Sequence, residues 1–259
     1  MFDSGFGGLT VARAVIDLLP AEDLVYVGDT GRYPYGPRPL DEVRGFALEI
    51  ARHLLDRHDV KMLVVACNTA SAAALDELRD ISPVPVLGVI EPGARAVVDA
   101  TRQGRVGVIG TLGTIGSGAY QRAIAHAGAD VELTCAACPG FVEFVERGET
   151  DSEQVHVLAE RLLVPVIDAG VDALLLGCTH YPFLARTIGD VMGPDVVLVD
   201  SADATAFAVR DLLHERGLAR DGGAGVHRFE SSGDVEVFRA LGRRLLGPEL
   251  DNVVGVDWD

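Results

Sequence analysis

Two short apolar runs, each ending in a cysteine, constrain the fold of this chain most strongly. Residues 63–69 read Leu-Val-Val-Ala-Cys-Asn-Thr, and residues 174–180 read Leu-Leu-Leu-Gly-Cys-Thr-His. Such a run, followed at once by helix-forming sequence, is typical of a fully buried parallel strand. In open α/β sheets the carboxyl ends of these strands form the crevice where ligands bind. We therefore expect Cys67 and Cys178 at two strand ends of this kind.

A cysteine at such a position has two interpretations. The unpaired N–H groups and the positive end of a helix dipole favour the nucleophilic thiolate. Free cysteine is also one of the most frequently buried residue types, and it often packs as a small hydrophobe. For either cysteine alone the second interpretation is the commoner one. The matched pair favours a single site with a sulfur atom on each side.

Strand and helix patterns alternate along the whole chain. This alternation is typical of an α/β fold with mostly parallel sheets and helices on both faces. Apolar spacing predicts one amphipathic helix over residues 40–54, and a longer one over 152–169 that Pro165 should kink or interrupt. Glu91-Pro92-Gly93 breaks the pattern and marks a candidate domain junction.

Composition excludes several classes of function. The net charge of −17 argues against nucleic acid as a principal partner, because phosphate binding needs clustered Lys and Arg. No apolar run approaches the roughly 18 residues of a membrane span, and the first residues do not resemble a signal peptide, so we expect a cytoplasmic protein. Lys61 is the only lysine. It precedes the first cysteine strand, away from the expected site, which disfavours pyridoxal phosphate chemistry.

The remaining cysteines and the histidines give weaker signals. Cys135 and Cys138 form a CxxC pair, but no second pair or closely spaced histidines complete a structural zinc site. We therefore expect thiols, not disulfides or a metal centre. The seven histidines fall mostly in amphipathic helical stretches and are expected at the surface. His180, two residues after Cys178, is the exception.

Six motifs occur in order between residue 1 and about residue 205. They are Asp3-Ser4-Gly5 with Gly7-Gly8, Gly28-Asp29-Thr30, Pro34-Tyr35-Gly36, Ala66-Cys67-Asn68-Thr69-Ala70-Ser71, Glu91-Pro92-Gly93 and Gly177-Cys178-Thr179-His180-Tyr181-Pro182. Together they resemble the cofactor-independent aspartate/glutamate racemase superfamily, and within it the glutamate racemases. Each motif alone is a weak signal, whereas six in sequence order are strong.

The resemblance implies two pseudo-symmetric α/β domains with the active site in the interdomain cleft. The first domain would be discontinuous, comprising residues 1–92 and 206–259, and the second would comprise residues 93–205. Cys67 and Cys178 would be the catalytic pair. The implied substrate-binding residues are Asp3, Ser4, Tyr35, Gly36, Asn68, Thr69, Thr179 and His180.

The resemblance also implies roles around each thiol. Asp3 would assist Cys67, and His180 with Glu146 would assist Cys178. The substrate would be glutamate, racemised at Cα without a cofactor or a metal. The D-glutamate would supply peptidoglycan synthesis. The resemblance leaves open whether the protein is a homodimer. Family members carry several apolar residues before the Asp-Ser-Gly motif, whereas only Met1 and Phe2 precede it here. We therefore expect a weakened first strand and a poorly anchored Asp3.

Three alternatives stay open from the sequence. The first is an aspartate racemase or a related two-thiol racemase of the same fold, since substrate length decides among these enzymes. The second is a regulatory interaction with another protein, for or against which the sequence gives no evidence. The third is a non-catalytic protein that binds a small dicarboxylate and in which both cysteines are inert. Thiol labelling that glutamate blocks would separate the last alternative from the enzymes, because an inert core thiol stays unreactive.

Overall fold

The computed structural model describes residues 1–128, 130–247, 250 and 252–258. Its chain divides into two compact units. Unit 1 comprises Met1–Val89 and Ala202–Asp259, and unit 2 comprises Ile90–Ser201. Each unit has its own sheet and its own hydrophobic core.

Unit 1 is built on a six-stranded sheet in which the strand order is β10-β9-β2-β1-β3-β4. Every described pairing in it is parallel, as the sequence predicts. The strands are β1 (Phe2–Asp3), β2 (Leu24–Gly28), β3 (Leu63–Val65), β4 (Val86–Gly88), β9 (His227–Ser231) and β10 (Val253–Gly255).

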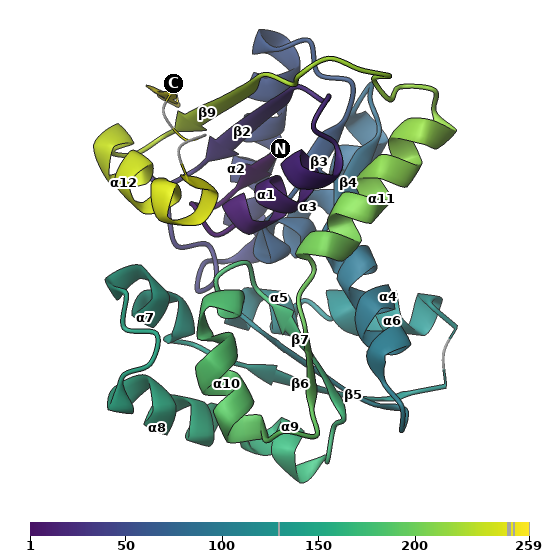
Figure 1. Cartoon of the computed structure of the whole chain (residues 1–259), viewed down its shortest axis with the longest axis vertical. Coiled ribbons are helices and arrows are strands. Elements are labelled where there is room, and N and C mark those ends of the chain that lie inside the picture. The colour runs from purple at the N-terminus through teal and green to yellow at the C-terminus, as the bar shows by residue number, and fades with distance from the viewer. Residues whose placement is uncertain (129, 248–249, 251, 259) are drawn as a thin grey trace. The chain divides into compact units, whose positions relative to one another are not determined.

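Helices cover both faces of this sheet (Figure 1). The helix α1 packs against α11 and α12 on one face, and α2 packs against α3 on the other. Two separate apolar clusters fill the spaces beneath these helices, because each helix turns its apolar stripe toward the sheet. The helices are α1 (Leu9–Leu18), α2 (Leu40–Arg57), α3 (Asn68–Ile81), α11 (Ala202–Glu215) and α12 (Val235–Leu246).

Unit 2 contains a four-stranded parallel sheet in the order β6-β5-β7-β8. Its strands are β5 (Arg105–Gly110), β6 (Glu132–Ala137), β7 (Ala173–Gly177) and β8 (Val197–Val199). Its helices are α4 (Ile90–Ala100), α5 (Leu112–Gly116), α6 (Ala119–His126), α7 (Phe141–Arg147), α8 (Glu153–Leu162), α9 (Val164–Asp168), the 3-10 helix η1 (Tyr181–Leu184) and α10 (Ala185–Met192). The predicted α/β class with mostly parallel sheets is thereby confirmed.

Proline behaves differently at the two positions that the sequence singled out. Pro165 interrupts the helical stretch as expected, since α8 ends at Leu162 and α9 begins at Val164. Glu91-Pro92-Gly93 does not interrupt the helix, so that part of the expectation is wrong, but the boundary between the two units falls directly before it, at Val89 and Ile90. These residues lie in the first turn of α4, where a missing proline N–H leaves no hydrogen bond unmade.

The first strand is short but firmly held. β1 lies between β2 and β3, and Phe2 pairs with Val27 on one side and with Val65 on the other. Asp3 is fully buried, and its backbone carbonyl accepts a hydrogen bond from Asp29 N at 3.0 Å. The expectation that Asp3 is poorly anchored is therefore wrong, because two residues suffice to place it in the middle of the sheet.

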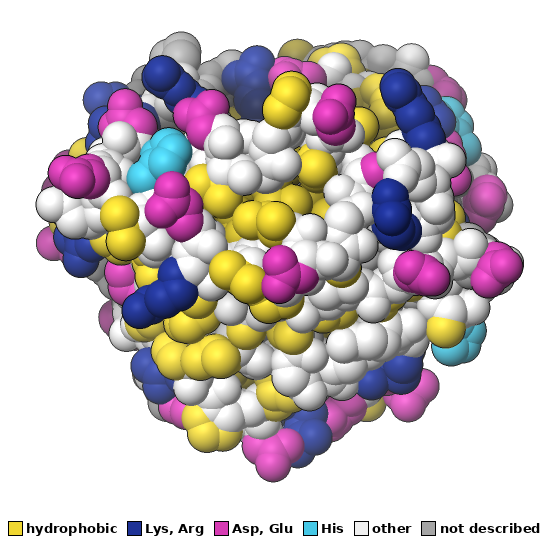
Figure 2. Space-filling view, turned by 90° about the horizontal axis from the view of Figure 1, so that it is seen from below, with side chains coloured by type: hydrophobic (Ala, Val, Ile, Leu, Met, Phe, Trp, Pro, Cys, Tyr) yellow, Lys and Arg dark blue, Asp and Glu magenta, His cyan; other side chains and the backbone are white. Residues whose placement is uncertain are grey.

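The surface of the described residues is mixed in character. Figure 2 shows hydrophobic side chains across the middle of one face, with acidic and basic side chains interspersed around them. Exposed apolar residues of unit 2 include Val157, Val164, Ile167 and Val197. Among the described residues, no helix is both long enough and apolar enough to span a membrane.

Candidate functional site

Cys67 lies where β3 meets α3, as predicted. The residue is the N-cap of α3, and its sulfur accepts a hydrogen bond from Ala70 N at 3.4 Å. The thiol in turn donates to the hydroxyl of Ser4 at 3.7 Å. Cys67 is buried. Its sulfur thus occupies the place of a capping oxygen, beside the carboxyl end of β1.

Asp3 organises the glycine-rich turn that follows β1. Its carboxylate accepts hydrogen bonds from the backbone N–H groups of Gly5 and Gly8, both at 3.1 Å. A Cβ atom at Gly8 would lie 2.6 Å from Cβ of Asp3 and 2.8 Å from the hydroxyl of Tyr26. Glycine is therefore required at position 8, because only a bare backbone fits against the buried acid.

Tyr35 belongs to a hydrogen-bonded network around Asp29 at the end of β2. The Tyr35 hydroxyl and the Arg32 guanidinium both donate to the Asp29 carboxylate, Arg32 at 2.8 Å. Ser232 at 2.5 Å and the Trp258 indole at 2.8 Å donate to its other oxygen. Burial, reinforced by the Asp29 charge, raises the pKa of Tyr35 far above its usual range. Tyr35 is thus a hydrogen-bond donor near neutral pH.

Sequence reasoning did not identify Ser232 and Trp258 as part of this network. They lie 203 and 229 residues from Asp29 in the chain, and no local motif marks them. Ser232 directly follows β9, which pairs with β2, and Trp258 follows β10, which pairs with β9. Only the sheet order could have revealed them.

The other predicted residues of unit 1 lie near these two groups. Asn68 and Thr69 are buried in the first turn of α3, directly after Cys67. Gly36 is half-buried in a turn closed by the hydrogen bond from Arg38 N to Tyr35 O at 3.1 Å. Unit 1 therefore gathers Cys67 with the candidate substrate-binding residues at one end of its sheet. These are Asp3, Ser4, Tyr35, Gly36, Asn68 and Thr69.

Cys178 follows β7 in unit 2, again at a strand end. An α-helix does not begin directly after it, in contrast to the prediction. The chain instead forms the 3-10 helix η1, and Tyr181 N donates to Cys178 O at 3.1 Å. Pro182 lacks the N–H that would donate to the carbonyl of Cys178 in an α-helical turn.

Gly177 allows the strand end before Cys178 to pack closely. A Cβ atom there would lie 2.7 Å from the backbone oxygen of Ile109 and 2.9 Å from the ring of Tyr120. Both neighbours are buried, so neither can move aside cheaply. Close packing therefore explains why glycine stands at position 177, directly before the cysteine of the motif.

His180 is oriented by Glu146. Nε2 of His180 lies 2.8 Å from Oε1 of Glu146 on α7, and Nδ1 lies 3.4 Å from the hydroxyl of Thr179. His180 is only 2% exposed, so its ring is held between these partners. The structure therefore brings together Cys178, Thr179 and His180 with the acid that the resemblance assigned to them.

Of the CxxC pair, Cys138 lies in the core of unit 2 and Cys135 is half-buried on β6. Cys138 is buried, and its backbone carbonyl accepts a hydrogen bond from the Tyr181 hydroxyl at 2.9 Å. Burial raises the pKa of Cys135 to about 11. Burial, followed by the charge of Cys178, raises the pKa of Cys138 to about 12. These values favour two packed thiols over a reactive or metal-binding pair.

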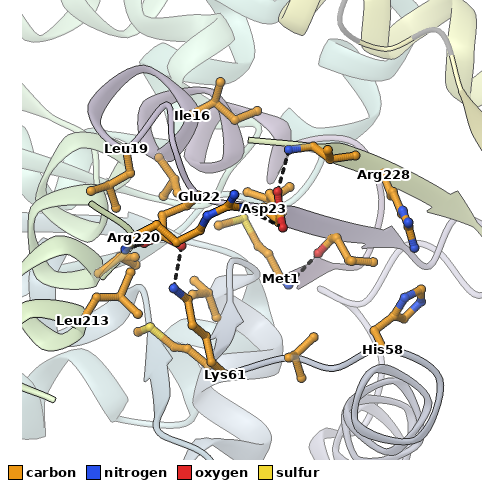
Figure 3. Close-up of a pocket in the computed structure, with 18 of the residues that line it drawn as sticks. Met1, Ile16, Leu19, Glu22, Asp23, His58, Lys61, Leu213, Arg220 and Arg228 are labelled. Atoms are coloured by element: carbon orange, nitrogen blue, oxygen red, sulfur yellow. Dashed lines mark hydrogen bonds and ion pairs between the residues drawn. The ribbon is translucent and has the colours of Figure 1, made fainter. Parts of the chain in front are cut away.

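A cavity of about 490 Å³ in unit 1 is distinct from the cysteine end of the sheet (Figure 3). It is lined by residues at the amino ends of the strands, including Met1, Leu24 and Met62. Lys61 lies here and forms an ion pair with Glu22 at 2.7 Å. The single lysine is therefore engaged at the opposite end of the sheet from Cys67.

Each of the two α/β units has a buried cysteine directly beyond an inner strand of its sheet, and this arrangement defines a class of two-thiol α/β proteins. The sequence profile of the Asp/Glu/Hydantoin racemase family matches residues 8–209. A glutamate racemase from Acidothermus cellulolyticus is 52% identical, over 98% of this chain and 96% of its own. The chain belongs to the Asp/Glu/Hydantoin racemase family, and it is accordingly an isomerase. The resemblance seen in the motifs is thereby confirmed.

Solved structures agree with this assignment. The crystal structure of a glutamate racemase isoform from Bacillus anthracis matches with a TM-score of 0.94 and 41% identity, covering 99% of this chain and 96% of that one. A glutamate racemase from Francisella tularensis in complex with D-glutamate matches with a TM-score of 0.91 and 34% identity, covering 99% and 95%. The fold described here is therefore that of known racemases.

Proposed function

We propose that the chain interconverts L- and D-glutamate, with Cys67 and Cys178 as its two acid–base groups. The observation that carries the proposal is the matched placement of the two thiols. Each follows a buried parallel strand, and each has hydrogen-bonding side chains directly after it. The relatives' activity on glutamate supports the choice of substrate. By the family resemblance, the D-glutamate supplies peptidoglycan synthesis.

The chemistry requires two groups that act on opposite faces of Cα. One sulfur, as thiolate, removes the Cα proton and becomes a thiol. The electron pair of the broken C–H bond moves into the adjacent carboxylate. The other sulfur, as thiol, gives its proton to the opposite face of Cα and becomes a thiolate. The two cysteines exchange roles in the reverse direction, so no redox step or cofactor enters the balance.

In unit 1, we assign the stabilisation of developing charge to the start of α3. Asn68 and Thr69 occupy its first turn, and helix amino termini favour negative charge. Ser4 accepts from the Cys67 thiol at 3.7 Å, which orients the sulfur before a proton is transferred. Asp3 holds the turn that carries Ser4, through its bonds to Gly5 and Gly8. In this account Asp3 acts through the turn that it positions.

In unit 2, we assign His180 and Glu146 to the support of Cys178. A carboxylate beside an imidazole fixes the orientation and the tautomer of the ring. The 2.8 Å contact between Glu146 and His180 provides such a pair two residues from the thiol. His180 would then present an oriented ring on the side of Cys178. The two thiols therefore have different supporting groups.

Circular dichroism of the purified protein with each enantiomer of glutamate and of aspartate, without added cofactor, tests the proposal. We expect the circular dichroism signal of both glutamate enantiomers to decay to zero, and that of both aspartate enantiomers to persist. Rapid decay with aspartate alone would identify an aspartate racemase. No decay with any substrate, together with saturable glutamate binding, would identify a dicarboxylate-binding protein.

A further inference from the structure

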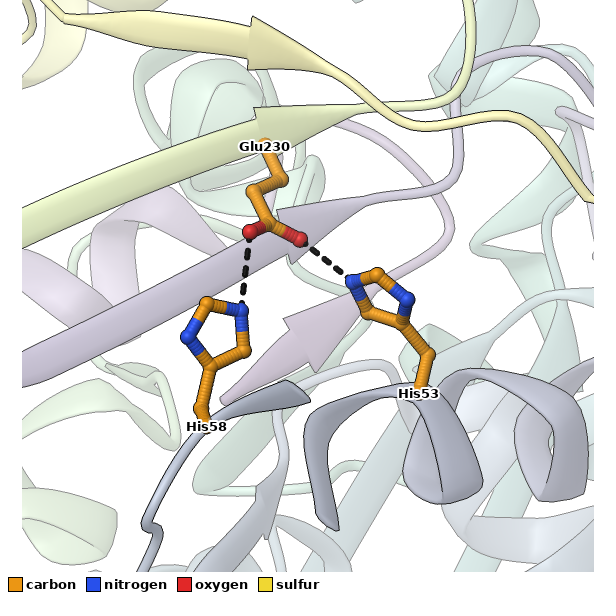
Figure 4. A group of neighbouring side chains, drawn as sticks. All are labelled: His53, His58 and Glu230. Atoms are coloured by element: carbon orange, nitrogen blue, oxygen red, sulfur yellow. Dashed lines mark hydrogen bonds and ion pairs between the residues drawn. The ribbon is translucent and has the colours of Figure 1, made fainter. Parts of the chain in front are cut away.

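Two histidines of unit 1 do not lie free on the surface as the sequence suggested. His53 and His58 both point at the carboxylate of Glu230 (Figure 4). Nε2 of His53 is 2.7 Å from one carboxylate oxygen, and Nε2 of His58 is 2.9 Å from the other. All three side chains are between 14% and 19% exposed. The amphipathic pattern of residues 40–54 misled the prediction because it says nothing about β9.

The backbone brings the two rings to the same place. Residues five apart on an α-helix point in directions about 140° apart, so His53 and His58 could not converge within one helix. The helix α2 ends at Arg57, and His58 adopts an extended conformation with φ −131° and ψ 141°. Its N–H still bonds to Leu54 O at 3.2 Å. The helix end therefore fixes where the second ring lies.

Further contacts hold the first ring in place. The His53 ring lies edge-on to the indole of Trp258, with centroids 5.6 Å apart and planes at 88°. It also lies edge-on to the His58 ring at 5.9 Å. Trp258 is itself fixed by its hydrogen bond to Asp29 at 2.8 Å. The cluster is thus supported by neighbours and does not consist of loose surface side chains.

We propose that His53, His58 and Glu230 form a binding site for Zn²⁺, with water completing the coordination. Two imidazoles and one carboxylate are ligands that Zn²⁺ commonly uses in proteins. Their ligand atoms all lie within 4.8 Å of one another. Tetrahedral Zn²⁺ with bonds of roughly 2.0–2.1 Å separates its ligands by about 3.3 Å. The 2.7 and 2.9 Å contacts run to different oxygens of the carboxylate, so the two rings must shift relative to Glu230 to share one metal.

Metal binding replaces the two histidine–carboxylate hydrogen bonds. In these bonds each Nε2 carries the proton, so on metal binding each imidazole takes the tautomer with its proton on Nδ1 and gives the lone pair of Nε2 to the metal, with no electron transfer. The site lies in unit 1 and contains none of the candidate catalytic residues. Its role would be structural, joining the end of α2 to β9. If the proposed function is correct, racemase activity should survive EDTA, and the metal-binding measurements below do not depend on that activity.

Co²⁺ titration followed by Zn²⁺ competition tests the site. We expect one Co²⁺ per chain with visible d–d absorption, displaced by Zn²⁺, and no cobalt–thiolate charge-transfer band. Zn²⁺ at about 100 times its Kd should raise Tm by roughly 5 °C. His53→Gln and His58→Gln should each weaken binding at least ~10-fold. His214→Gln is the matched control, because His214 is an exposed histidine of the same unit, on α11.

Three results would overturn the proposal. The first is a thiolate band, which would place the metal on cysteine. The second is binding by His53→Gln and His58→Gln that equals that of His214→Gln. The third is no saturable binding to the wild-type protein, which would leave only a histidine–carboxylate bridge. Glu230→Gln adds a further readout, and the two histidine variants keep the test decisive if this strand variant does not fold.

Discussion

At the scale of single residues, the four cysteines divide into two kinds. Cys67 follows β3, and its thiol lies 3.7 Å from the Ser4 hydroxyl, while Cys178 follows β7 directly before Thr179 and His180. In unit 2, Cys138 is buried and Cys135 is half-buried, and burial raises the pKa of both thiols. Because the thiolate is the nucleophile, we expect Cys135 and Cys138 to react slowly whatever their CxxC spacing.

Iodoacetamide should label Cys135 and Cys138 slowly in the native protein. Burial raises the pKa of Cys135 to about 11 and that of Cys138 to about 12. At pH 8, roughly 0.1% of Cys135 and roughly 0.01% of Cys138 is therefore thiolate. The rate should rise about tenfold for each pH unit until these pKa values are approached. Peptide mass spectrometry measures it, with the denatured protein as control. Equal rates in native and denatured protein at pH 8 would contradict the account.

Residue-level prediction from the sequence succeeded where chemistry is local. The strand-end positions of both cysteines and the neighbourhood of Asn68, Thr69, Thr179 and His180 follow from short motifs. The clustering of His53 with Glu230 does not, because 177 residues separate them and β9 is placed only by the complete sheet. Side chains joined across strands distant in sequence leave no periodic signal.

At the scale of elements, the glycines that end β2 and β7 allow neighbouring backbone and side chains to pack closely against these strand ends. Gly28 ends β2, and a Cβ atom there would lie 2.5 Å from Phe238 of α12 and 2.7 Å from Gly5 O. Gly177 ends β7 under a similar constraint. The sequence predicted these strands well, because continuous apolar runs are strong signals. It mispredicted the segment after Cys178 as an α-helix, because Pro182 favours a tighter turn there.

Gly177→Ala should destabilise the protein by about 1–3 kcal/mol, because the added methyl group overpacks the end of β7. Gly45→Ala is the matched control. Gly45 lies in the exposed part of α2, and a Cβ atom there meets nothing within 4 Å. This variant should be more stable than wild type by about 0.5–1 kcal/mol. Urea denaturation measures both. A Gly177→Ala variant as stable as wild type would show that the strand end can relax.

At the scale of the whole molecule, the catalytic proposal depends on residues from both units. Cys67 belongs to unit 1 and Cys178 to unit 2, and the chain crosses between the units at residues 89–90 and 201–202. The alternation of strands and helices predicted the class of fold, and the six motifs predicted the family. Which residues of unit 1 support the site could not be read from the motifs alone, as Ser232 and Trp258 show.

The central claim is that both sulfurs act on one substrate, each from its own face. Its most direct test is elimination from a glutamate analogue that carries a β leaving group, by Cys67→Ser and Cys178→Ser. Elimination needs proton abstraction on one face only, whereas racemisation needs both groups. The family resemblance implies that Cys67 would remove the proton from the D enantiomer and Cys178 from the L enantiomer.

Cys67→Ser should therefore still eliminate from the L analogue and Cys178→Ser from the D analogue. Glutamate racemisation should fall by roughly 10²–10⁴-fold in both variants, because serine is a far weaker acid than cysteine. The racemisation and elimination rates, measured on the same preparations, show whether a folded variant has lost proton abstraction on only one face of the substrate. Racemisation near the wild-type rate by either single variant would contradict the two-thiol mechanism.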